Sequence, residues 1–483
     1  MAYIRKVRTK SGAVAVQIIQ KSHGVIVRVE HLGSTHTPEE LAVLLALARD
    51  QLHRGQYSLF DRAAVPPALM VTETTSDLLL TILREQYERL GFATLDDETF
   101  ALLCLARIVE PVSKLDSLRV LAELGVADVR KQQLYRCLAR VVTQDYRKTI
   151  SAQCFAHASQ TGIRLVLYDV TTLYFEIQKE DEYRKPGMSK ERRLEPQIVV
   201  GLLVDQSGFP LGLHSFTGNT AETTTILPVL DAFKAQHGLT DVTVVADAGM
   251  LSAKNLQALA DAGYRYIVGS RLAKIPYAIA EYQQTDRELM DGQILTTAGE
   301  PGQRIIYQYR AKRAALDLRN IAKQVAKAER IVNGTATVKR AKFLTVTTKD
   351  RGLNQALIAK TKALAGIKGY VTNSDQPTAA IIAAYHQLWH VEASFRMSKA
   401  DLRARPIFHR KRDSIEAHLT VVLTALAIAR MIERATGVSI RRVVRLLRPI
   451  RSATLQVNGH VYRAEPMIPE PAANLIQKIR TGH

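Results

Sequence analysis

Three carboxylates in this sequence occupy positions from which they could hold metal ions. Asp169 follows the mostly apolar residues 165–168, Asp247 follows the apolar part of "VTVVADAG", and Glu392 lies in a long helical pattern. An aspartate at the end of a buried strand costs desolvation free energy unless a cation or hydrogen-bond donors compensate it. Because α/β sheets bind ligands beside their strand ends, two such aspartates and a helix glutamate predict an all-oxygen site for hard divalent cations such as Mg²⁺.

The helical pattern that contains Glu392 places two other polar residues on the same helix face as this glutamate. Tyr385, Glu392 and Lys399 are spaced seven apart, and seven residues at 3.6 per turn return nearly to one face. Taken singly, Asp247 is consistent with a turn residue and Glu392 with a solvated helix carboxylate. Taken together, the three acids favour a metal-dependent nuclease, because paired ions can activate one oxygen and stabilise another in phosphoryl displacement.

The elements that must position these residues follow an α/β order. Patterns between residues 163 and 270 predict three strands, a helix, a strand, a helix and a strand, which together form a mixed sheet. Residues 206–208 predict a hairpin turn between the second and third strands. Farther along, one long helix is predicted from Thr378 to about Lys399, followed by a basic loop and a second, apolar helix.

The net charge indicates a polyanionic partner. The 483 residues carry 66 Lys+Arg against 46 Asp+Glu, a formal charge of +20, and nucleic acid is the default partner for such an excess. A generally basic protein is the alternative. The charge is uneven, since between Arg304 and Lys342 only Asp317 and Glu329 oppose eleven basic residues, namely Arg304, Arg310, Lys312, Arg313, Arg319, Lys323, Lys327, Arg330, Lys339, Arg340 and Lys342. This density predicts an inserted subdomain that faces phosphates, with a merely solvated charged helix as the alternative.

The N-terminal region predicts a small antiparallel β-meander, a helix, and then a helical region from Ser76 to Thr149. Within it, residues 117–142 predict two helices around a turn at Gly125. The second helix carries the basic residues Arg130, Lys131, Arg136 and Arg140, whose spacing suits a DNA-contacting helix. The segment alone does not distinguish this from an ordinary helical hairpin with a solvated basic face.

The three cysteines and the absence of an apolar leader bear on the compartment in which the protein works, and they favour the interior of the cell. Cys104, Cys137 and Cys154 lack the spacings of a zinc site or a disulfide framework, so we expect buried thiols in a reducing environment. The longest nearly apolar run, residues 419–429, is too short to span a bilayer. We therefore expect an intracellular protein with no membrane partner.

These patterns predict an α/β protein with an interrupted core. The expected parts are 1–72, β-meander and helix; 73–160, helical DNA-binding region; 161–270, first part of the core; 271–368, inserted basic subdomain; 369–440, second part of the core with the Glu392 helix; and 441–483, basic C-terminal tail.

Several blocks in order carry a family resemblance. "YDVTTLYFE", "VVADAGMLSAKNL" and "YHQLWHVEASFRMSK" resemble segments of the DDE transposases of bacterial insertion sequences, which have an RNase H-like catalytic core. The sequence is similar to the branch with a Tyr-x2-Arg-x3-Glu-x6-Lys signature and an insertion before the glutamate. The similarity covers roughly residues 163–434. The signature here is Tyr385, Leu388, Glu392 and Lys399, so its arginine is replaced by Leu388, and Arg396, one turn after Glu392, is a candidate substitute.

The resemblance implies a mechanism and a set of partners. Asp169, Asp247 and Glu392 would hold two Mg²⁺ ions, with Mn²⁺ as a substitute, for cleavage at the ends of an insertion sequence and transfer of the freed 3′-OH into target DNA. The partners would be double-stranded DNA, as terminal inverted repeats and as target, and a second copy of the chain in the active dimer. The N-terminal region would recognise the repeats, and work would take place on the nucleoid in the bacterial cytoplasm. The residues expected to position DNA are Tyr385, Arg396, Lys399, Arg403 and Arg405.

Two alternatives remain open beside this interpretation. One is an RNase H-like nuclease that acts without strand transfer, and the other is a DNA-binding regulator that has lost catalysis. A phosphatase is disfavoured, because the second aspartate expected two residues after Asp169 is Thr171.

Overall fold

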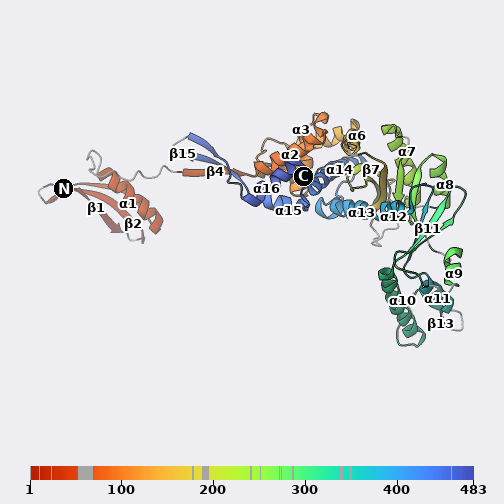
Figure 1. Cartoon of the computed structure of the whole chain (residues 1–483). Helices are drawn as coiled ribbons and strands as arrows, with labels where there is room; N and C mark the ends of the chain where they lie inside the picture. Colours follow the sequence, from red (N-terminus) through yellow and green to blue (C-terminus); the bar gives the residue numbers. More distant parts are fainter. Residues whose placement is uncertain are drawn as a thin grey trace. The chain divides into compact units, whose positions relative to one another are not determined.

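The chain is described by a computed structural model (Figure 1). Contacts divide it into two compact units, one formed by Met1–Met70 with Leu455–Tyr462 and the other by Val71–Thr454 with Arg463–His483. The structure describes residues 2–9, 11–22, 24–52, 69–160, 162–176, 179–187, 195–239, 242–250, 252–270, 272, 275–284, 288–337, 341–346, 351–457 and 460–482.

The smaller unit contains an antiparallel meander packed against a helix. Its elements are β1 (Ala2–Arg8), β2 (Val14–Ser22), β3 (Val25–Thr35) and α1 (Pro38–Leu52). Gly12, in the turn between β1 and β2, has φ 86°, a conformation that costs glycine least. Val16, Ile18 and Ala48 form the buried core between sheet and helix. The predicted meander and helix are confirmed.

A helical region follows in the larger unit. Its elements are α2 (Asp77–Arg89), the 3₁₀ turn η1 (Phe92–Leu95), α3 (Glu98–Val109), α4 (Ser117–Glu123), α5 (Lys131–Thr143) and α6 (Tyr146–Ser159). The predicted helix pair around Gly125 is therefore present as α4 and α5. Ten of the twelve residues of α3 are buried, so this helix lies at the centre of the region. The three cysteines are buried free thiols, as predicted.

The core sheet has the predicted order of elements. These are β5 (Leu165–Tyr174), β6 (Gln197–Asp205), β7 (Pro210–Thr217), the short turn η2 (Glu222–Thr224), α7 (Ile226–His237), β8 (Thr243–Ala246), α8 (Ala253–Asp261) and β9 (Arg265–Ser270). β5 pairs antiparallel with β6 and parallel with β8, so the sheet is mixed. Asp205 Oδ1 accepts N–H bonds from Ser207 and Phe209 at 2.8 Å each, which forms the predicted hairpin turn.

The segment expected as a separate insertion instead contributes strands to the core sheet. Its elements are α9 (Tyr277–Gln283), β10 (Ile294–Ala298), β11 (Arg304–Tyr309), α10 (Ala311–Val332), β12 (Leu344–Val346), β13 (Arg351–Leu353), α11 (Gln355–Ala363) and β14 (Ile367–Thr372). The sheet order is β10-β11-β14-β9-β8-β5-β6-β7. The predicted boundaries at 271 and 368 therefore differ from the structure, because backbone pairing with β9 across about a hundred residues is invisible in local pattern.

The long helix predicted to Lys399 is also broken. α12 (Thr378–His386) ends before a turn at Gln387 and Leu388, α13 (Trp389–Arg396) follows, and a π-helical turn, η3 (Met397–Asp401), completes the segment. α12 packs against β8 and β9, whereas α13 packs against β5 and β6. Since sheets twist, a straight helix would not stay against both strand pairs.

The C-terminal part is folded and is not the predicted basic tail. It contains α14 (Arg412–Thr436), α15 (Ile440–Leu447), β15 (Ser452–Val457), β16 (His460–Ala464) and α16 (Glu470–Thr481). A small sheet has the order β16-β15-β4, where β4 is Leu69–Thr75. Leucine and isoleucine side chains of α15 and α16 join the main core, so the arginines of these two helices belong to packed helices and not to an extended tail.

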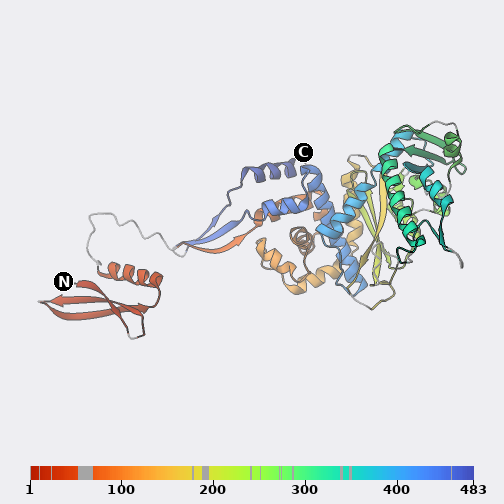
Figure 2. The same ribbon diagram turned by 90° about the horizontal axis from the view of Figure 1, so that it is seen from below.

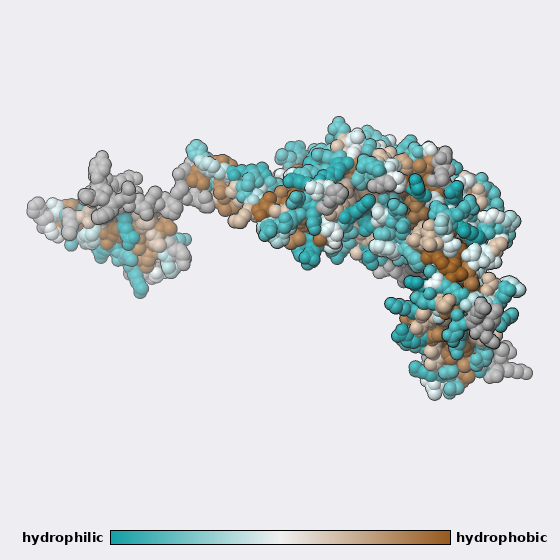
Figure 3. Space-filling model, viewed as in Figure 1, coloured by the Kyte–Doolittle hydropathy of each residue, from teal (hydrophilic) through white to brown (hydrophobic). Residues whose placement is uncertain are grey.

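Helix α14 is the central helix of the larger unit. By length and composition it is apolar enough to cross a membrane, but 83% of its apolar window is buried inside the protein, as in a core helix. It packs against α3, α5 and β7, and Figure 2 shows the orange N-terminal helices and the blue C-terminal helices gathered beside the sheet. Hydrophilic side chains cover much of the face seen in Figure 3.

Candidate active site

The register of the parallel strands places Asp169 and Asp247 at equivalent positions. The last β5–β8 pair is Leu167 with Val245, and each aspartate lies two residues farther along its strand direction. β8 ends at Ala246, so Asp247 follows a strand end as predicted. Asp169 does not end its strand, because β6 continues to pair with β5 to Tyr174. The carboxylates nonetheless emerge where the two parallel strands separate.

Glu392 on α13 borders the same cavity as the two aspartates. The cavity has a volume of about 290 Å³ and is bordered by Asp169, Asp247 and Glu392. The turn at Gln387 and Leu388 starts α13 on a new course along β5, which brings its first-turn glutamate to the sheet. The other lining residues are Tyr168, Lys368, Tyr385, His386, Leu388, Trp389 and Val391.

Tyr385 holds Asp247 in place. Its hydroxyl donates to Asp247 Oδ1 at 3.0 Å, and the Ala248 N–H donates to the same oxygen at 2.8 Å. Burial and the neighbouring Asp247 charge raise the pKa of Tyr385 above its ordinary value, so the phenol remains a proton donor. The hydroxyl lies against Gly269 of β9, where an added Cβ would come within 2.5 Å of it. Both donors use Oδ1, and they fix the carboxylate while leaving Oδ2 outside these two bonds.

Lys368 is a functional candidate that the sequence analysis missed. Lys368 contributes its ammonium group to the lining of the cavity, and its Nζ lies 4.3 Å from the Tyr385 ring centroid. Burial lowers the pKa of Lys368, with a further lowering from the Arg313 charge, while Asp247 and Glu392 oppose both effects. No motif marked this residue, because the strand β14 that carries it reaches the site through pairing with β9.

The other signature positions lie outside this cavity or carry no charge. Leu388 borders the cavity as an apolar residue. Lys399, in the π-helical turn, donates to the Thr171 hydroxyl on β5, so the expected single face with Tyr385 and Glu392 is not continued. Arg396 is exposed and does not line the cavity. Its charge acts on Glu433, whose pKa is raised by burial, and opposes that rise only weakly.

The remaining predicted DNA contacts are dispersed over the larger unit. Arg405 stacks over the Tyr174 ring at 5.3 Å, next to the end of β5. Arg403 has a positive φ of 44° and lines a different cavity. The α5 set is exposed at the start of that helix and consists of Arg130, Lys131 and Arg136.

The basic helix of the central segment reaches toward the cavity. The Lys and Arg side chains of α10 are exposed, while Ile321 and Ala328 face a small apolar core. Burial lowers the pKa of both His386 and Lys368 beside the cavity, and charges at the start of α10 add to this, Arg310 on His386 (after Lys368) and Arg313 on Lys368. Lys339 and Arg340, which were part of the predicted basic set, lie outside the described residues.

The donor chemistry of the site fits hard divalent cations. Carboxylate oxygens from two strands and a helix border one cavity, and such oxygens are the preferred ligands of Mg²⁺. Within the described ranges, no three His, Cys, Asp or Glu side chains form a cluster that could hold one ion. The three carboxylates therefore border the cavity of about 290 Å³ without meeting at a single point.

Comparison with known proteins gives one informative match. A family described as "Transposase DDE domain" matches residues 160–428, and no curated protein matches the chain. Among solved structures, a piggyBac transposase synaptic complex with hairpin DNA is similar at TM-score 0.40 and 10% identity, covering 74% of this chain and 70% of that one. A Mos1 transposase paired-end complex with left transposon end has TM-score 0.17 and 15% identity, covering 47% and 66%. At these scores the structural similarities add no argument to the family match.

Proposed function

The chain belongs to the DDE transposase family, an endonuclease and polynucleotidyl transferase class that moves DNA, and from this premise we propose that Asp169, Asp247 and Glu392 are its catalytic carboxylates. The observation that carries the proposal is that these three acids, which are up to 223 residues apart in the chain, all border one cavity. The shared register of Asp169 and Asp247 supports it, because parallel strands present matched positions at one sheet edge.

Divalent cations are the proposed cofactor, specifically two Mg²⁺ ions with Mn²⁺ as a substitute. Asp169, Asp247 and Glu392 would hold them, since an all-carboxylate set suits hard cations. When bound, such ions supply Lewis-acid stabilisation of the attacking and departing oxygens. Tyr385 keeps Asp247 oriented through its hydrogen bond, so the carboxylate need not reorganise during the reaction.

Lys368 and Lys399 have separate proposed roles beside the carboxylates. Lys368 offers an ammonium to a phosphate oxygen in the cavity. Burial lowers the pKa of Lys368, and a phosphate beside it would favour the charged ammonium form. Lys399 ties the π-helical turn to β5 through the Thr171 hydroxyl, and Thr171 lies two residues after Asp169 on that strand. Arg396 stays a prediction as a DNA contact, from a position outside the cavity.

The proposed substrate is double-stranded DNA, first as the terminal inverted repeats of an insertion sequence and then as the target. The exposed basic face of α10, together with Arg405 and the more distant α5 set, would provide phosphate contacts. Pairing two DNA ends requires two copies of the chain, so we propose a homodimer in the active complex. We place this activity on the nucleoid of a bacterial cytoplasm.

The test uses the DNA that flanks the reading frame on both sides. End-labelled flanks are incubated with Mg²⁺ and either the wild-type protein or Asp169→Asn. We expect new 3′-OH ends with the wild type only, together with equal DNA binding by both proteins. Equal cleavage by Asp169→Asn would contradict the proposed site.

The same experiment separates the alternatives. Addition of a target plasmid should give joined products, and their absence beside normal cleavage would favour a nuclease without strand transfer. Binding without cleavage by the wild type would favour a regulator. We also expect binding to weaken steeply with salt, because many phosphate contacts release counterions, and a flat salt response would argue against α10 as a DNA contact.

A further inference from the structure

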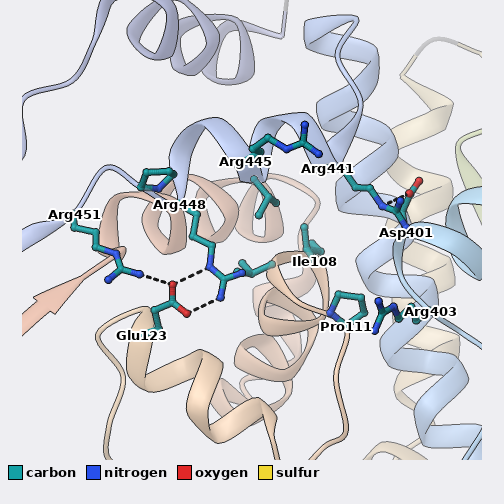
Figure 4. A pocket seen from close by; sticks show the side chains of 12 residues that line it. Ile108, Pro111, Glu123, Asp401, Arg403, Arg441, Arg445, Arg448 and Arg451 are labelled. Atoms are coloured by element: carbon teal, nitrogen blue, oxygen red, sulfur yellow. Dashed lines mark hydrogen bonds and ion pairs between the residues drawn. The ribbon is translucent and has the colours of Figure 1, made fainter.

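A second cavity lies among the helices of the larger unit (Figure 4), and none of the three proposed catalytic carboxylates lines it. Its volume is about 740 Å³, and it is bordered by α3, α4, α15 and the segment just after η3. We call it the arginine cavity, because five arginines line it against two carboxylates, an excess of three positive charges. The arginines are Arg403, Arg441, Arg445, Arg448 and Arg451, and the acids are Glu123 and Asp401.

The two acids are already used to hold arginines in place. Glu123 accepts from Arg448 at 2.6 and 2.8 Å and from Arg451 at 2.8 Å, and Asp401 pairs with Arg441 at 2.7 Å, as the dashed lines of Figure 4 indicate. Such bonds fix guanidinium planes in space. The two acids are therefore occupied as supports for these three arginines.

Two arginines of the cavity lack such a support. In the described part of the chain, neither Arg403 nor Arg445 makes a side-chain hydrogen bond or ion pair, and both are exposed. Figure 4 places both side chains at the border of the cavity with no dashed contact. Their charge is thus available to an anion without the loss of an existing contact.

Arg403 also lies beside another cation. Arg107 is buried, and burial together with the Arg403 charge lowers its pKa to about 10. Among the described residues, the Arg107 donors reach the carbonyl oxygens of Val112 at 2.8 Å and Arg403 at 2.7 Å, and its buried Nε has no hydrogen-bond partner there. Arg403 itself has φ 44°, a backbone conformation that non-glycine residues rarely adopt. Two positive charges, of which Arg403 is the exposed one, therefore lie together at this end of the arginine cavity.

We propose that the arginine cavity binds a backbone phosphate of the DNA end held in the active site, an inference that rests on the proposed function. Preorganised guanidinium groups of one sign suit phosphate oxygens, which accept bidentate bonds. The cavity has a volume of about 740 Å³, and its lining also includes the apolar side chains of Ile108 and Val444.

The position of the cavity predicts which phosphate it contacts. Glu392 and Arg403 lie eleven residues apart along a mostly helical segment, so their Cα atoms are on the order of 15 Å apart at about 1.5 Å per residue. This length equals the rise of roughly four or five base pairs. The contacted phosphate should therefore lie about that far from the cleaved bond.

The test compares Arg403→Ala/Arg445→Ala with Arg442→Ala, a matched control. Arg442 is an exposed arginine on the same helix α15 that does not line the cavity. We measure the affinity of each full-length protein for the terminal DNA across a salt series. The double variant should bind at least about tenfold more weakly, with the slope of log K against log salt reduced by about one to two, while the control changes either value little.

A second measurement keeps the result independent of folding. Ethylation of single phosphates should weaken wild-type binding at a position about four or five base pairs from the cut, and this penalty should disappear in the double variant. A slope and an ethylation pattern equal to those of Arg442→Ala would overturn the proposal while leaving the proposed function intact. Loss of self-association with an unchanged DNA slope would also overturn it, in favour of a protein partner. No DNA binding by the wild type would reject the proposed function and this site together.

Discussion

Two cavities of the larger unit both combine acidic and basic side chains, but in opposite proportions. In the arginine cavity, Glu123 and Asp401 are bonded to arginines, so the carboxylates organise cations and the surplus charge is positive. In the cavity of the proposed catalytic carboxylates, called the catalytic cavity below, Asp247 accepts bonds from a phenol and a backbone N–H. Neither Asp247 nor Glu392 forms an ion pair with another described residue.

The difference shows that the role of a carboxylate depends on the group that bonds to it. An arginine partner neutralises the acid and stabilises its ionised form. Neutral donors orient the acid but leave its negative charge for a cation. This difference agrees with the proposals that the carboxylate cavity holds cations and that the arginine cavity holds a phosphate.

The largest expected effect comes from neutralising Glu392. Glu392→Gln keeps the shape of the side chain and removes the charge that would hold a cation, so we expect cleavage of the DNA end to fall by on the order of a thousandfold or more. DNA binding at low salt should persist. Single-turnover cleavage of end-labelled DNA measures the rate, and a gel-shift assay measures binding.

A matched control for this variant is Glu329→Gln on α10. Glu329 is exposed and lies outside the catalytic cavity, so its removal changes the net charge equally without affecting the site. Similar cleavage rates for the two variants would mean that the cavity is not the catalytic site and would remove the basis of the comparison.

A smaller loss is expected from Lys368→Ala. If the Lys368 ammonium positions a phosphate oxygen, its removal should lower the cleavage rate by roughly ten- to a hundredfold, whereas Lys368→Arg should retain most activity. Lys362→Ala, an exposed lysine six residues earlier, serves as the control. The readout is the single-turnover rate at saturating DNA, which separates positioning from affinity.

Leu388 allows a sharper version of this experiment. Leu388 borders the same cavity, so Leu388→Arg placed in the Lys368→Ala background should restore part of the rate. Arg396→Ala should have a smaller effect than Lys368→Ala, because Arg396 does not line the cavity. The reverse order, with Arg396→Ala the more damaging change, would return the role to Arg396.

Gly269→Ala tests the support of the catalytic cavity rather than its charge. An added Cβ would lie 2.5 Å from the Tyr385 hydroxyl and 3.2 Å from the Ala248 Cβ, so Tyr385 must move and its bond to Asp247 must lengthen. We expect cleavage to fall by about tenfold, with Tyr385→Phe giving a loss of similar size. Rates that are unchanged in both variants would show that the orientation of Asp247 does not limit cleavage.

Much of the core was predictable because its signals are local. Alternation, turns and apolar runs gave the strand and helix order from β5 to β9, and the apolar run before Asp247 correctly marked a strand end. Asp169 was placed at a strand end incorrectly, because the pairing that extends β5 comes from β6. The roles of the three acids stay predictions until the variants are measured.

The features that sequence reasoning missed depend on contacts between distant segments. β10, β11 and β14 join the core through pairing with β9, and Lys368 reaches the cavity only through that pairing. The break between α12 and α13 has no proline or glycine to announce it, since the twisted sheet imposes it. The arginine cavity likewise combines α3, α4, α15 and the segment after η3, and no single stretch of sequence carries its pattern.

The smallest expected effect is also the one that separates stability from binding in the arginine cavity. Hydrogen bonds from Arg448 lower the pKa of Glu123, with burial opposing them and the charges of Arg448 and Arg451 adding to the lowering. A carboxyl with a depressed folded-state pKa contributes stability above its unfolded pKa and loses it as the pH falls through the folded value. Glu123→Gln should therefore lower the free energy of unfolding by about 1 kcal/mol at pH 7, a modest value for partly exposed pairs, and the difference should vanish in acid.

The same substitution should act in the opposite direction on DNA. Removing the Glu123 charge raises the positive excess of the arginine cavity from three to four, so affinity for terminal DNA should rise by about two- to fivefold at moderate salt. Urea unfolding at several pH values and a salt series of DNA binding measure the two effects on one variant. Stability and affinity that fall together would mean that Glu123 matters only as a support for Arg448 and Arg451. Opposite changes would show that this carboxylate stabilises the fold at the expense of DNA binding, the reverse of what the catalytic carboxylates are proposed to do.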